Sequence, residues 1–390
     1  MSLDWKEFHK KITAMAMDKG LPLSGSFELT SRCNFKCKMC YVCSPANDRK
    51  AMEAELTAEQ WIELGKQARD AGMFYLILTG GEVFLRKDFE KIYEALSEMG
   101  LNITIFTNGS LITPEKARWL GRVPPHRVSI TVYGGSPDTY EKVTGSRDGY
   151  MNTMRALEAL RSEGIRLEVK TTVVEGNYQD YKELYKIAHT YSNVLGVVNY
   201  ISPRREGCFS DPLGNRLSPV DIVEYEERIS LYGQRTYPRK DSKLELNINE
   251  DSMDQKSREQ SEMEEQVIIS EKTQKMLESS AFRCQSGKTG FWLTWDGRMI
   301  PCGLLDIPSA KPLEVGFAKA WEQLKEGCLQ VPKCSDCENC TMKSDCISCP
   351  GRLMTETGSF TKPAAYLCES ARHRVEIRQR KQQEAVKIAT

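Results

Sequence analysis

The chain has 390 residues, 40% of them hydrophobic, enough for one large barrel with a smaller domain or for two ordinary domains. Lys and Arg number 54, as do Asp and Glu, and the resulting net charge of zero argues against a general nucleic-acid binder. No apolar run approaches the roughly 20 residues of a membrane span. Residues 1–21 lack the hydrophobic core of a secretory signal, so we expect a cytoplasmic protein without membrane contact.

Short β-rich runs alternate with helical patterns over the first half of the chain. The predicted strands are residues 26–29, 74–78, 103–106, 128–132, 167–173 and 194–200. Helix signals lie between them, among them a capping box at Thr57 and Gln60 and a cap residue before proline at Thr113-Pro114. Repeated strand–helix units predict an α/β fold with a parallel sheet, here a partial (β/α)6 TIM-like barrel. Parallel barrels carry their chemistry on the loops after the C-terminal strand ends.

Composition divides the chain into five parts. We expect an N-terminal extension, the barrel, a charged linker, a small cysteine-rich module and a C-terminal helix or tail, at residues 1–24, 25–235, 236–281, 282–370 and 371–390. The linker is polar and heavily charged, which is typical of a solvated insertion. In the cysteine-rich module, Asp296-Gly297 predicts a hairpin turn.

Three closely spaced cysteines follow the first predicted strand. Among the 14 cysteines of the chain, Cys33, Cys37 and Cys40 lie within eight residues. In a reducing compartment such thiols are metal ligands more often than disulfides. Thiolates are the ligands that iron–sulfur clusters take, and three of them leave one iron of a cubane open to a small molecule. A structural zinc site is the alternative, with Cys43 as a candidate fourth or alternative third thiol.

Glycine and small polar residues follow the next strands. Gly80 and Gly81 let backbone approach a ligand closely, and Glu82 can accept hydrogen bonds from an ammonium group. An ordinary turn is the simpler interpretation of these three residues alone. Asn108 ends the third predicted strand and Ser129 lies on the fourth, where small polar side chains can meet a carboxylate or a ribose.

Charged residues of the later barrel segments receive no assigned role. Arg147 can pair with a bound carboxylate or lie on the surface. Glu168 and Lys170 are two residues apart, so they share one face of the fifth strand. That face points either into the barrel or toward a helix or solvent.

A second group of cysteines lies near the C-terminus. The candidate ligands there are Cys284, Cys302, Cys334, Cys337, Cys340, Cys346, Cys349 and Cys368. Paired C-x-x-C steps also fit a zinc ribbon, which stays the alternative. We interpret Cys43, Cys208 and Cys328 as ordinary thiols, because free cysteine packs as a small hydrophobe.

The first cysteine spacing, followed by the aromatic Tyr41, resembles the signature of the radical S-adenosylmethionine (SAM) superfamily. The resemblance implies a [4Fe–4S] cluster on Cys33, Cys37 and Cys40, whose fourth iron binds the methionine part of SAM. It also implies that an electron from the cluster cleaves SAM to a 5′-deoxyadenosyl radical, which takes a hydrogen atom from a substrate. The implied SAM contacts are Tyr41 near the adenine, Gly80, Gly81 and Glu82 at the amino group, and Ser129, with Asn108 a further candidate.

The C-terminal cysteines resemble the SPASM domain, the auxiliary-cluster extension of radical SAM peptide and protein maturases. The resemblance implies two auxiliary [4Fe–4S] clusters. One takes Cys337, Cys340, Cys346 and Cys368. The other takes Cys284, Cys302 and Cys349, and it either keeps an open iron or recruits Cys334. The relatives usually have three residues between the last two cysteines of the tight group, whereas this chain has two.

The resemblance implies a radical SAM oxidoreductase that acts on a peptide or protein, and we expect it to mature a ribosomally made peptide by a crosslink, a thioether or an epimerisation. Only residues 1–24 precede the barrel, so we expect no separate N-terminal peptide-recognition domain. A leader peptide would be held by a separate protein, by residues 236–281, or not at all. The expected electron donor is a flavodoxin or a ferredoxin. The alternatives are formylglycine maturation of sulfatases, tetrapyrrole or cofactor tailoring, and a non-catalytic zinc or electron-transfer protein.

Overall fold

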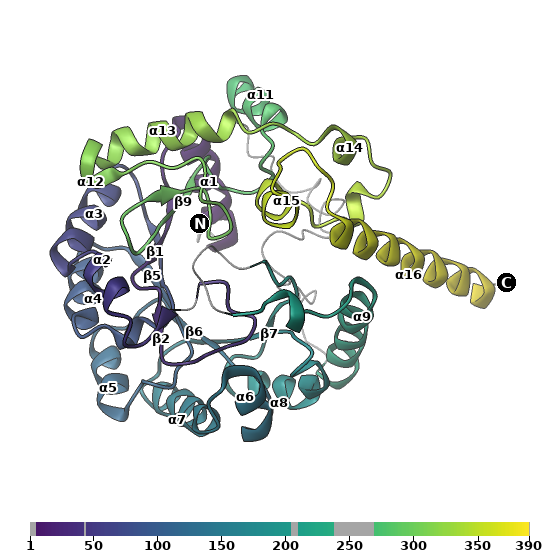
Figure 1. Cartoon of the computed structure of the whole chain (residues 1–390), viewed down its shortest axis with the longest axis horizontal. Coiled ribbons are helices and arrows are strands. Elements are labelled where there is room, and N and C mark those ends of the chain that lie inside the picture. The colour runs from purple at the N-terminus through teal and green to yellow at the C-terminus, as the bar shows by residue number, and fades with distance from the viewer. Residues whose placement is uncertain (1–4, 43, 204–209, 238–268, 390) are drawn as a thin grey trace.

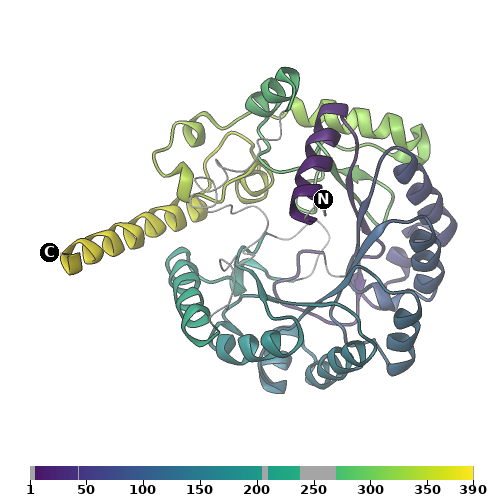
Figure 2. The same cartoon turned by 180° about the vertical axis from the view of Figure 1, so that it is seen from behind.

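The computed structural model describes residues 5–42, 44–203, 210–237 and 269–389. Figure 1 looks along the axis of an incomplete ring of strands, with helices outside it and the C-terminal segments along its open side, and Figure 2 gives the opposite view. The thiols Cys43 and Cys208 and most of the predicted charged linker lie outside the described residues. No helix in the described ranges is long and apolar enough to cross a membrane.

In the described part of the chain, eight strands form one sheet in the order β10-β9-β1-β4-β5-β6-β7-β8. They are β1 (Ser24–Glu28), β4 (Tyr75–Thr79), β5 (Asn102–Thr107), β6 (Arg127–Thr131), β7 (Leu167–Thr172), β8 (Leu195–Val198), β9 (Gly290–Leu293) and β10 (Met299–Ile300). The six successive strands β1, β4, β5, β6, β7 and β8 are parallel neighbours, which confirms the predicted partial barrel. A separate parallel pair joins β2 (Arg32–Cys33) to β3 (Ser44–Pro45).

The sheet also contains two strands from the cysteine-rich module. β9 pairs in parallel with β1, on the side away from β4, and β10 returns antiparallel to β9. The hairpin turn at Asp296-Gly297 was expected, and the Gly297 φ of +87° explains why glycine is needed there. Pairing of the hairpin with β1 was not expected, and the Trp292 Nε1 donation to Glu28 at 2.7 Å reinforces it. The module is therefore continuous with the barrel sheet.

Helices cover the outside of the sheet. They are α3 (Ala58–Asp70), α4 (Phe89–Glu98), α5 (Pro114–Arg122), α6 (Pro137–Thr144), α7 (Asp148–Ser162), α8 (Tyr181–Tyr191), α9 (Pro219–Thr236) and α13 (Phe317–Leu329). The predicted capping box is present, since Thr57 and Gln60 exchange side-chain-to-backbone hydrogen bonds at the start of α3. The Thr113 side chain likewise caps α5.

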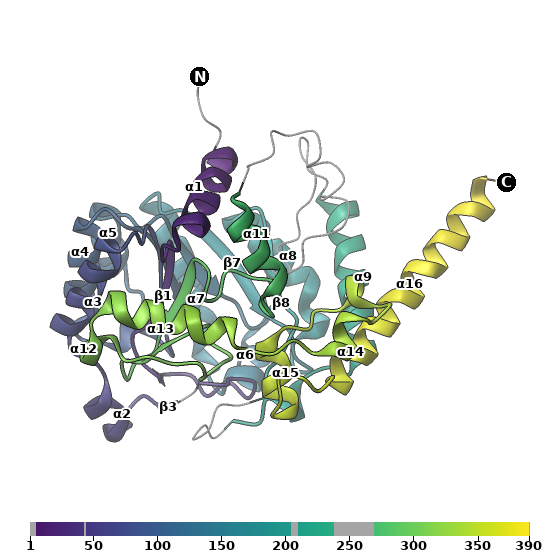
Figure 3. The same ribbon diagram turned by 90° about the horizontal axis from the view of Figure 1, so that it is seen from above.

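Further helical segments flank the barrel and build the module. They are α1 (Trp5–Lys19), α2 (Arg49–Ala54), α11 (Glu271–Ser279), α12 (Pro312–Val315), α14 (Ser335–Glu338), α15 (Pro350–Thr357) and α16 (Ala365–Ala389), with 3-10 turns η1 (Val83–Leu85), η2 (Tyr178–Asp180), η3 (Leu213–Asn215) and η5 (Lys343–Asp345). α16 begins earlier than expected, packs against α9 and extends away from the barrel in Figure 3. Its first turn carries Cys368.

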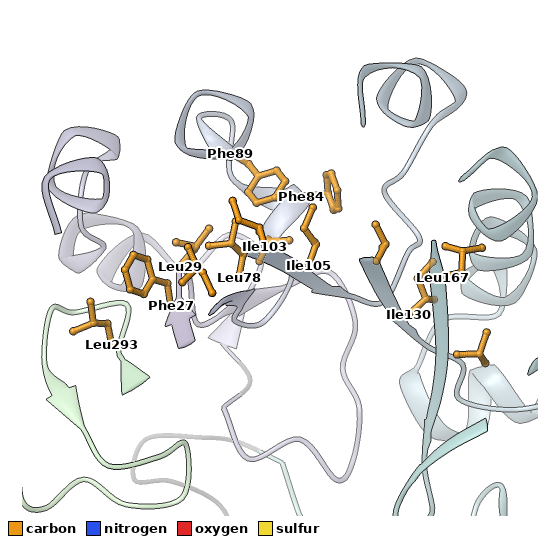
Figure 4. Packing of buried hydrophobic residues seen from close by; sticks show 14 of the residues in the cluster. Phe27, Leu29, Leu78, Phe84, Phe89, Ile103, Ile105, Ile130, Leu167 and Leu293 are labelled. Carbon is orange, nitrogen blue, oxygen red and sulfur yellow. The ribbon is translucent and has the colours of Figure 1, made fainter. Parts of the chain in front are cut away.

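The main core lies between the sheet and its outer helices. Figure 4 shows buried side chains on the outward face of the strands, such as Phe27, Leu78 and Ile105, packed toward the helices. Phe27 lies against Trp61 of α3 with ring centroids 5.2 Å apart. Burying a side chain of this size contributes roughly 1.5–3 kcal/mol, so the outward face fixes the register of each strand. The alternate residues of each strand face the interior of the barrel.

One end of the barrel is covered by α1. The His9 Nδ1 atom lies 2.9 Å from the hydroxyl of Tyr75, the first residue of β4. Trp5 stacks on His126, which directly precedes β6. Both contacts are at the N-terminal ends of strands. The opposite end, where the strands deliver their C-terminal loops, remains for the site.

Candidate active site

The loop that follows β1 gathers three thiols. Cys33 and Cys40 are half-buried and Cys37 is buried, and none of the cysteines that the structure describes is in a disulfide. Burial and then the Glu82 carboxylate raise the pKa of Cys33 to about 12, with a further contribution from Cys40. Burial and then Cys40 and Cys33 raise the pKa of Cys37 well above its ordinary value. The three predicted ligands therefore lie within electrostatic reach of one another.

Hydrogen-bond donors point at these sulfurs. The backbone N–H of Phe35 lies 3.4 Å from the Cys33 Sγ, and the Asn108 Nδ2 lies 3.7 Å from it. Tyr133 forms a side-chain hydrogen bond to Cys37 and lies half-buried beside the three thiols. Such donors favour the thiolate form that a metal cluster requires. Sequence analysis missed Tyr133, and its one signal was its position as the first aromatic after the fourth barrel strand.

The two glycines of the Gly-Gly-Glu segment approach the chain's own backbone. A Cβ at Gly80, whose φ is +149°, would lie 2.4 Å from the Thr30 carbonyl oxygen, and one at Gly81 would lie 2.2 Å from that of Arg32. Gly81 N–H donates to the Thr30 carbonyl at 2.7 Å. The glycines therefore clamp the segment that leads into Cys33, and any larger side chain would displace it.

Glu82 is completely buried and already accepts several hydrogen bonds. Its carboxylate accepts from the Thr107 hydroxyl at 2.8 and 2.9 Å, from the Asn108 N–H at 2.8 Å and from the Phe84 N–H at 3.1 Å. Burial nevertheless raises the pKa of Glu82 above its ordinary value. This carboxylate ties the loop after β4 to the C-terminal end of β5, beside the thiols.

Asn108 links the same region to the cysteine loop. Its Nδ2 donates to the Asn34 Oδ1 at 3.0 Å, and its Oδ1 accepts from the Ser110 N–H and hydroxyl at 2.8 and 2.7 Å. Both ends of the Asn108 amide are thus engaged in holding the loop that carries Cys33.

A buried ionic network anchors the entry to that loop. Arg32 binds Glu55 through two hydrogen bonds, at 2.7 and 2.9 Å. Arg86 donates to the carbonyls of Leu29 and Leu56 at 2.8 and 3.0 Å and also reaches Glu55 at 3.4 Å. Because bidentate arginine contacts fix geometry as well as charge, the residues before Cys33 are held firmly.

The other predicted SAM contacts lie apart from this network. Tyr41 has its hydroxyl beside Gly303, where an added Cβ would come within 3.1 Å of it, so the aromatic side chain reaches toward the second cysteine region. Ser129 is buried on β6, opposite Glu168 of β7, with which its side chain forms a hydrogen bond. Arg147 lies on the surface and pairs with Asp138 and Glu141.

Charged residues line the interior face of β6 and β7. Glu168 lies 3.2 Å from the Lys170 Nζ and 3.6 Å from the Arg127 guanidinium, and the three side chains are 16–31% exposed. Burial opposes ionisation of Glu168, but Lys170 and Arg127 outweigh it and hold the pKa of Glu168 below its ordinary value. Lys170 also lies 4.0 Å over the Phe106 ring. We call Arg127, Glu168 and Lys170 the lumen charge cluster.

The C-terminal cysteines fall into two spatial groups. In the first group, burial and then Cys334, Cys346 and Cys368 raise the pKa of Cys337 to about 12, and Cys340 acts on Cys368. In the second group, burial raises the pKa of Cys302 to about 12, with contributions from Cys349 and Cys284. Cys334, which the sequence left open as a ligand near Cys302, belongs spatially to the first group. The second group therefore has three thiols, one fewer than the four that saturate a four-iron cluster.

The donor set of all three regions fits iron–sulfur clusters, because every candidate ligand is a soft thiol partly shielded from water. Among the described residues, no three His, Cys, Asp or Glu side chains are gathered closely enough to share a single metal ion. In a four-iron cluster, by contrast, each thiolate binds a different iron. The wider arrangement of the thiols is therefore compatible with clusters.

Comparison with known proteins identifies the domain that carries the first three thiols. Residues 27–190 match the family model described as the radical SAM superfamily, and this range contains the three thiols, Glu82, Asn108 and Ser129. These residues carry a radical SAM domain, and the chain is an enzyme of the radical SAM oxidoreductase type with a cysteine-rich C-terminal region.

Its relatives differ in what their names say they make. The chain is 27% identical over 348 residues to an AdoMet-dependent heme synthase of Methanosarcina barkeri, a match that covers 87% of this chain and 95% of that protein. It is 28% identical over 169 residues to the sporulation killing factor maturation protein SkfB of Bacillus subtilis, covering 43% of this chain and 40% of that protein. The fold resembles SAM-bound SuiB of Streptococcus suis, with a TM-score of 0.66 at 17% identity over 93% of this chain and 81% of that one.

Proposed function

We propose that this enzyme cleaves SAM at the Cys33, Cys37 and Cys40 site and uses the resulting radical to modify a tetrapyrrole. The observation that carries the proposal is the extent of the match to the heme synthase, which spans 87% of this chain and must therefore extend into the cysteine-rich region. The match to the peptide-maturing SkfB covers 43% of the chain. Tetrapyrrole tailoring was an alternative at the sequence level, and we now prefer it to peptide maturation.

The lumen charge cluster supports a substrate that carries carboxylates. Lys170 is level with Thr131 at the C-terminal end of β6, the end of the barrel where the thiols lie. Arg127 and Lys170 share one acidic partner, Glu168, so the lumen charge cluster carries a net positive charge. Tetrapyrroles bear carboxylate side chains, and a carboxylate gains most from a cation that is partly shielded from water.

When bound, the [4Fe–4S] cluster would supply the electron that splits SAM into methionine and a 5′-deoxyadenosyl radical. The residues of the chain hold the participants in place. Cys33, Cys37 and Cys40 would hold the cluster, and the Glu82 and Asn108 contacts fix the loop that bears it. Burial of the Glu82 carboxylate and of Ser129 keeps water away from the SAM-binding side of the barrel.

The two C-terminal thiol groups would hold auxiliary [4Fe–4S] clusters. The spatial division into the Cys337 group and the Cys302 group supports this part of the proposal. A flavodoxin or ferredoxin would deliver the electrons. Because the Tyr41 hydroxyl lies beside Gly303, the residue after Cys302, the first cluster loop and the second thiol group are in contact.

The test is an anaerobic reaction of the reconstituted full chain. Dithionite and SAM are supplied with iron coproporphyrin III, a carboxylate-bearing iron tetrapyrrole, or with a mixed peptide library as the control. We expect the tetrapyrrole to raise 5′-deoxyadenosine formation. We also expect the mass spectrum of the recovered tetrapyrrole to show a product of lower mass. Stimulation by peptides with none by the tetrapyrrole would contradict the proposal and favour peptide maturation.

A matched pair of variants tests the lumen. Lys170→Met should raise the KM for the tetrapyrrole about tenfold, because a buried charge-assisted hydrogen bond is worth roughly 1.5–3 kcal/mol, while basal SAM cleavage persists. Lys186→Met serves as the control, since the Lys186 side chain is exposed on α8, where it pairs with Glu183. Equal KM values for the two variants would show that Lys170 does not contribute to tetrapyrrole binding.

A further inference from the structure

We propose that Cys328, in the last turn of α13, is the fourth thiol of the site formed by Cys284, Cys302 and Cys349. Sequence analysis interpreted Cys328 as an ordinary thiol, and the resemblance implied either an open iron at this site or a fourth ligand from Cys334. The inference rests on the proposed auxiliary clusters and is independent of the substrate.

The packing of α13 aims Cys328 inward. The buried residues of this helix are Phe317, Ala320, Trp321, Leu324 and Cys328, which lie on one face. Cys328 is 3% exposed, at the end of that face. The packing of this helix face therefore sets the direction in which the Cys328 thiol points.

The sulfur lies against the turn that carries Cys284. A Cβ added at Gly287 would come within 2.4 Å of the Cys328 Sγ, so only a glycine lets this thiol reach the turn. Three residues earlier, the Cys284 thiol lies 3.3 Å from the Ser286 hydroxyl in the same turn. Glycine is also required here by its φ of +68°.

The other two thiols face the same space. After burial, Cys302 and Cys284 are the groups that act on Cys328 electrostatically, and Cys349 and Cys284 act on Cys302 in the same way. Cys349 caps α15 by accepting from the Arg352 N–H at 3.4 Å, and the first turn of α15 brings Gly351 against Cys302. Four segments, each fixed by regular structure or a tight turn, thus bring one thiol each.

Ligand number makes this arrangement informative. A four-iron cluster is saturated by four thiolates. The neighbouring group already contains Cys334, Cys337, Cys340, Cys346 and Cys368, which is one more thiol than a cluster needs. Cys334 lies against Cys337 in that group and not at the Cys302 site, where Cys328 fills the fourth position. The site then has no open iron and serves electron transfer, not substrate binding.

The experiment uses the full chain with Cys33, Cys37 and Cys40 all replaced by Ala, which leaves only auxiliary iron. We expect this parent to bind about eight irons, the sum for two four-iron clusters. Addition of Cys328→Ala should leave one iron without a thiolate. Ferricyanide would then take one electron, release that iron as Fe²⁺ and leave a three-iron cluster visible by electron paramagnetic resonance.

Val331→Ala, a buried truncation three residues along the chain, is the matched control and should behave as the parent. If Cys328→Ala also keeps all its iron and gives no three-iron signal, the assignment is wrong. A parent without iron would overturn the auxiliary clusters and this inference with them, whereas normal auxiliary iron with no tetrapyrrole activity would contradict only the proposed function.

A second measurement avoids any change at Cys328. In the reduced parent, added 2-mercaptoethanol should leave the resonance g-values unchanged, because no auxiliary iron is open to an external thiol. A shifted spectrum would reveal an open iron and would contradict the assignment of Cys328.

Discussion

The two cysteine regions of the molecule are held in different ways. The first cluster loop, residues 33–40, is fixed by buried hydrogen bonds and ion pairs from the barrel, such as those of Glu55, Glu82 and Asn108. The cysteine-rich module from Cys334 to Cys368 has short elements, among them the four-residue α14 and the three-residue η5, and a small core around Tyr200 and Leu353. We therefore expect the first region to be organised before metal binds, and the second to depend on its proposed clusters for much of its order.

This difference fits the role that we propose for each region. A loop that presents an open iron to SAM needs a fixed shape, because a small displacement of reacting groups slows the chemistry. A region that only passes electrons needs its clusters to be present and shielded.

Replacement of Cys33, Cys37 and Cys40 by Ala should abolish SAM cleavage and leave the C-terminal region loaded. The iron content should fall by about four per chain, one cubane, while 5′-deoxyadenosine falls to background. Iron analysis and chromatography of the reaction check both numbers. SAM cleavage retained in the triple variant would refute the assignment of the first region.

Removal of iron by a chelator should unfold the two regions unequally. The module should lose most of its amide hydrogen-exchange protection, since few backbone hydrogen bonds and apolar contacts remain without metal. The strands β4 to β7 should keep theirs, because their core is apolar. Hydrogen exchange with mass spectrometry measures both regions in one sample. Equal loss of protection in the two regions would show that the module depends on metal no more than the barrel does.

Glu82→Ala should weaken SAM binding about tenfold and cost roughly 1–3 kcal/mol of stability, since it leaves the Asn108 N–H and the Thr107 hydroxyl without their acceptor. The cluster iron should remain. Calorimetric SAM titration and denaturant unfolding provide the values, and Glu90→Ala on the exposed side of α4 is the control. Unchanged SAM affinity would mean that Glu82 acts only as a turn residue.

Tyr200→Phe should have the smallest effect. The Tyr200 hydroxyl donates to Glu356 of α15 at 2.9 Å, and Arg216 keeps the same carboxylate paired after the change. We therefore expect a loss of about 1 kcal/mol, confined to the junction between β8 and the module. Thermal unfolding followed by exchange at α15 measures it. A loss as large as that of Glu82→Ala would show that the module docks more firmly than we infer.

Local patterns predicted much of the fold. All six barrel strands were expected within two residues of their observed bounds, and the Thr57 and Thr113 caps are present. The site was harder, because Tyr133 and the Arg32–Glu55 pair reach the thiols only through the packing of separate segments. Periodicity and capping are short-range properties, which a sequence displays directly.

By itself, the sequence determined the alternation that builds a parallel barrel and the spacing of three thiols on the loop after its first strand. Only the tertiary structure decided that β9 extends the sheet beside β1, that Cys334 joins Cys337, and that Cys328 meets Cys284. The physical reason is the range of the interactions. A strand pattern or a cysteine triplet is written within ten residues, whereas the grouping of distant thiols follows from how α13, the hairpin and α15 pack together.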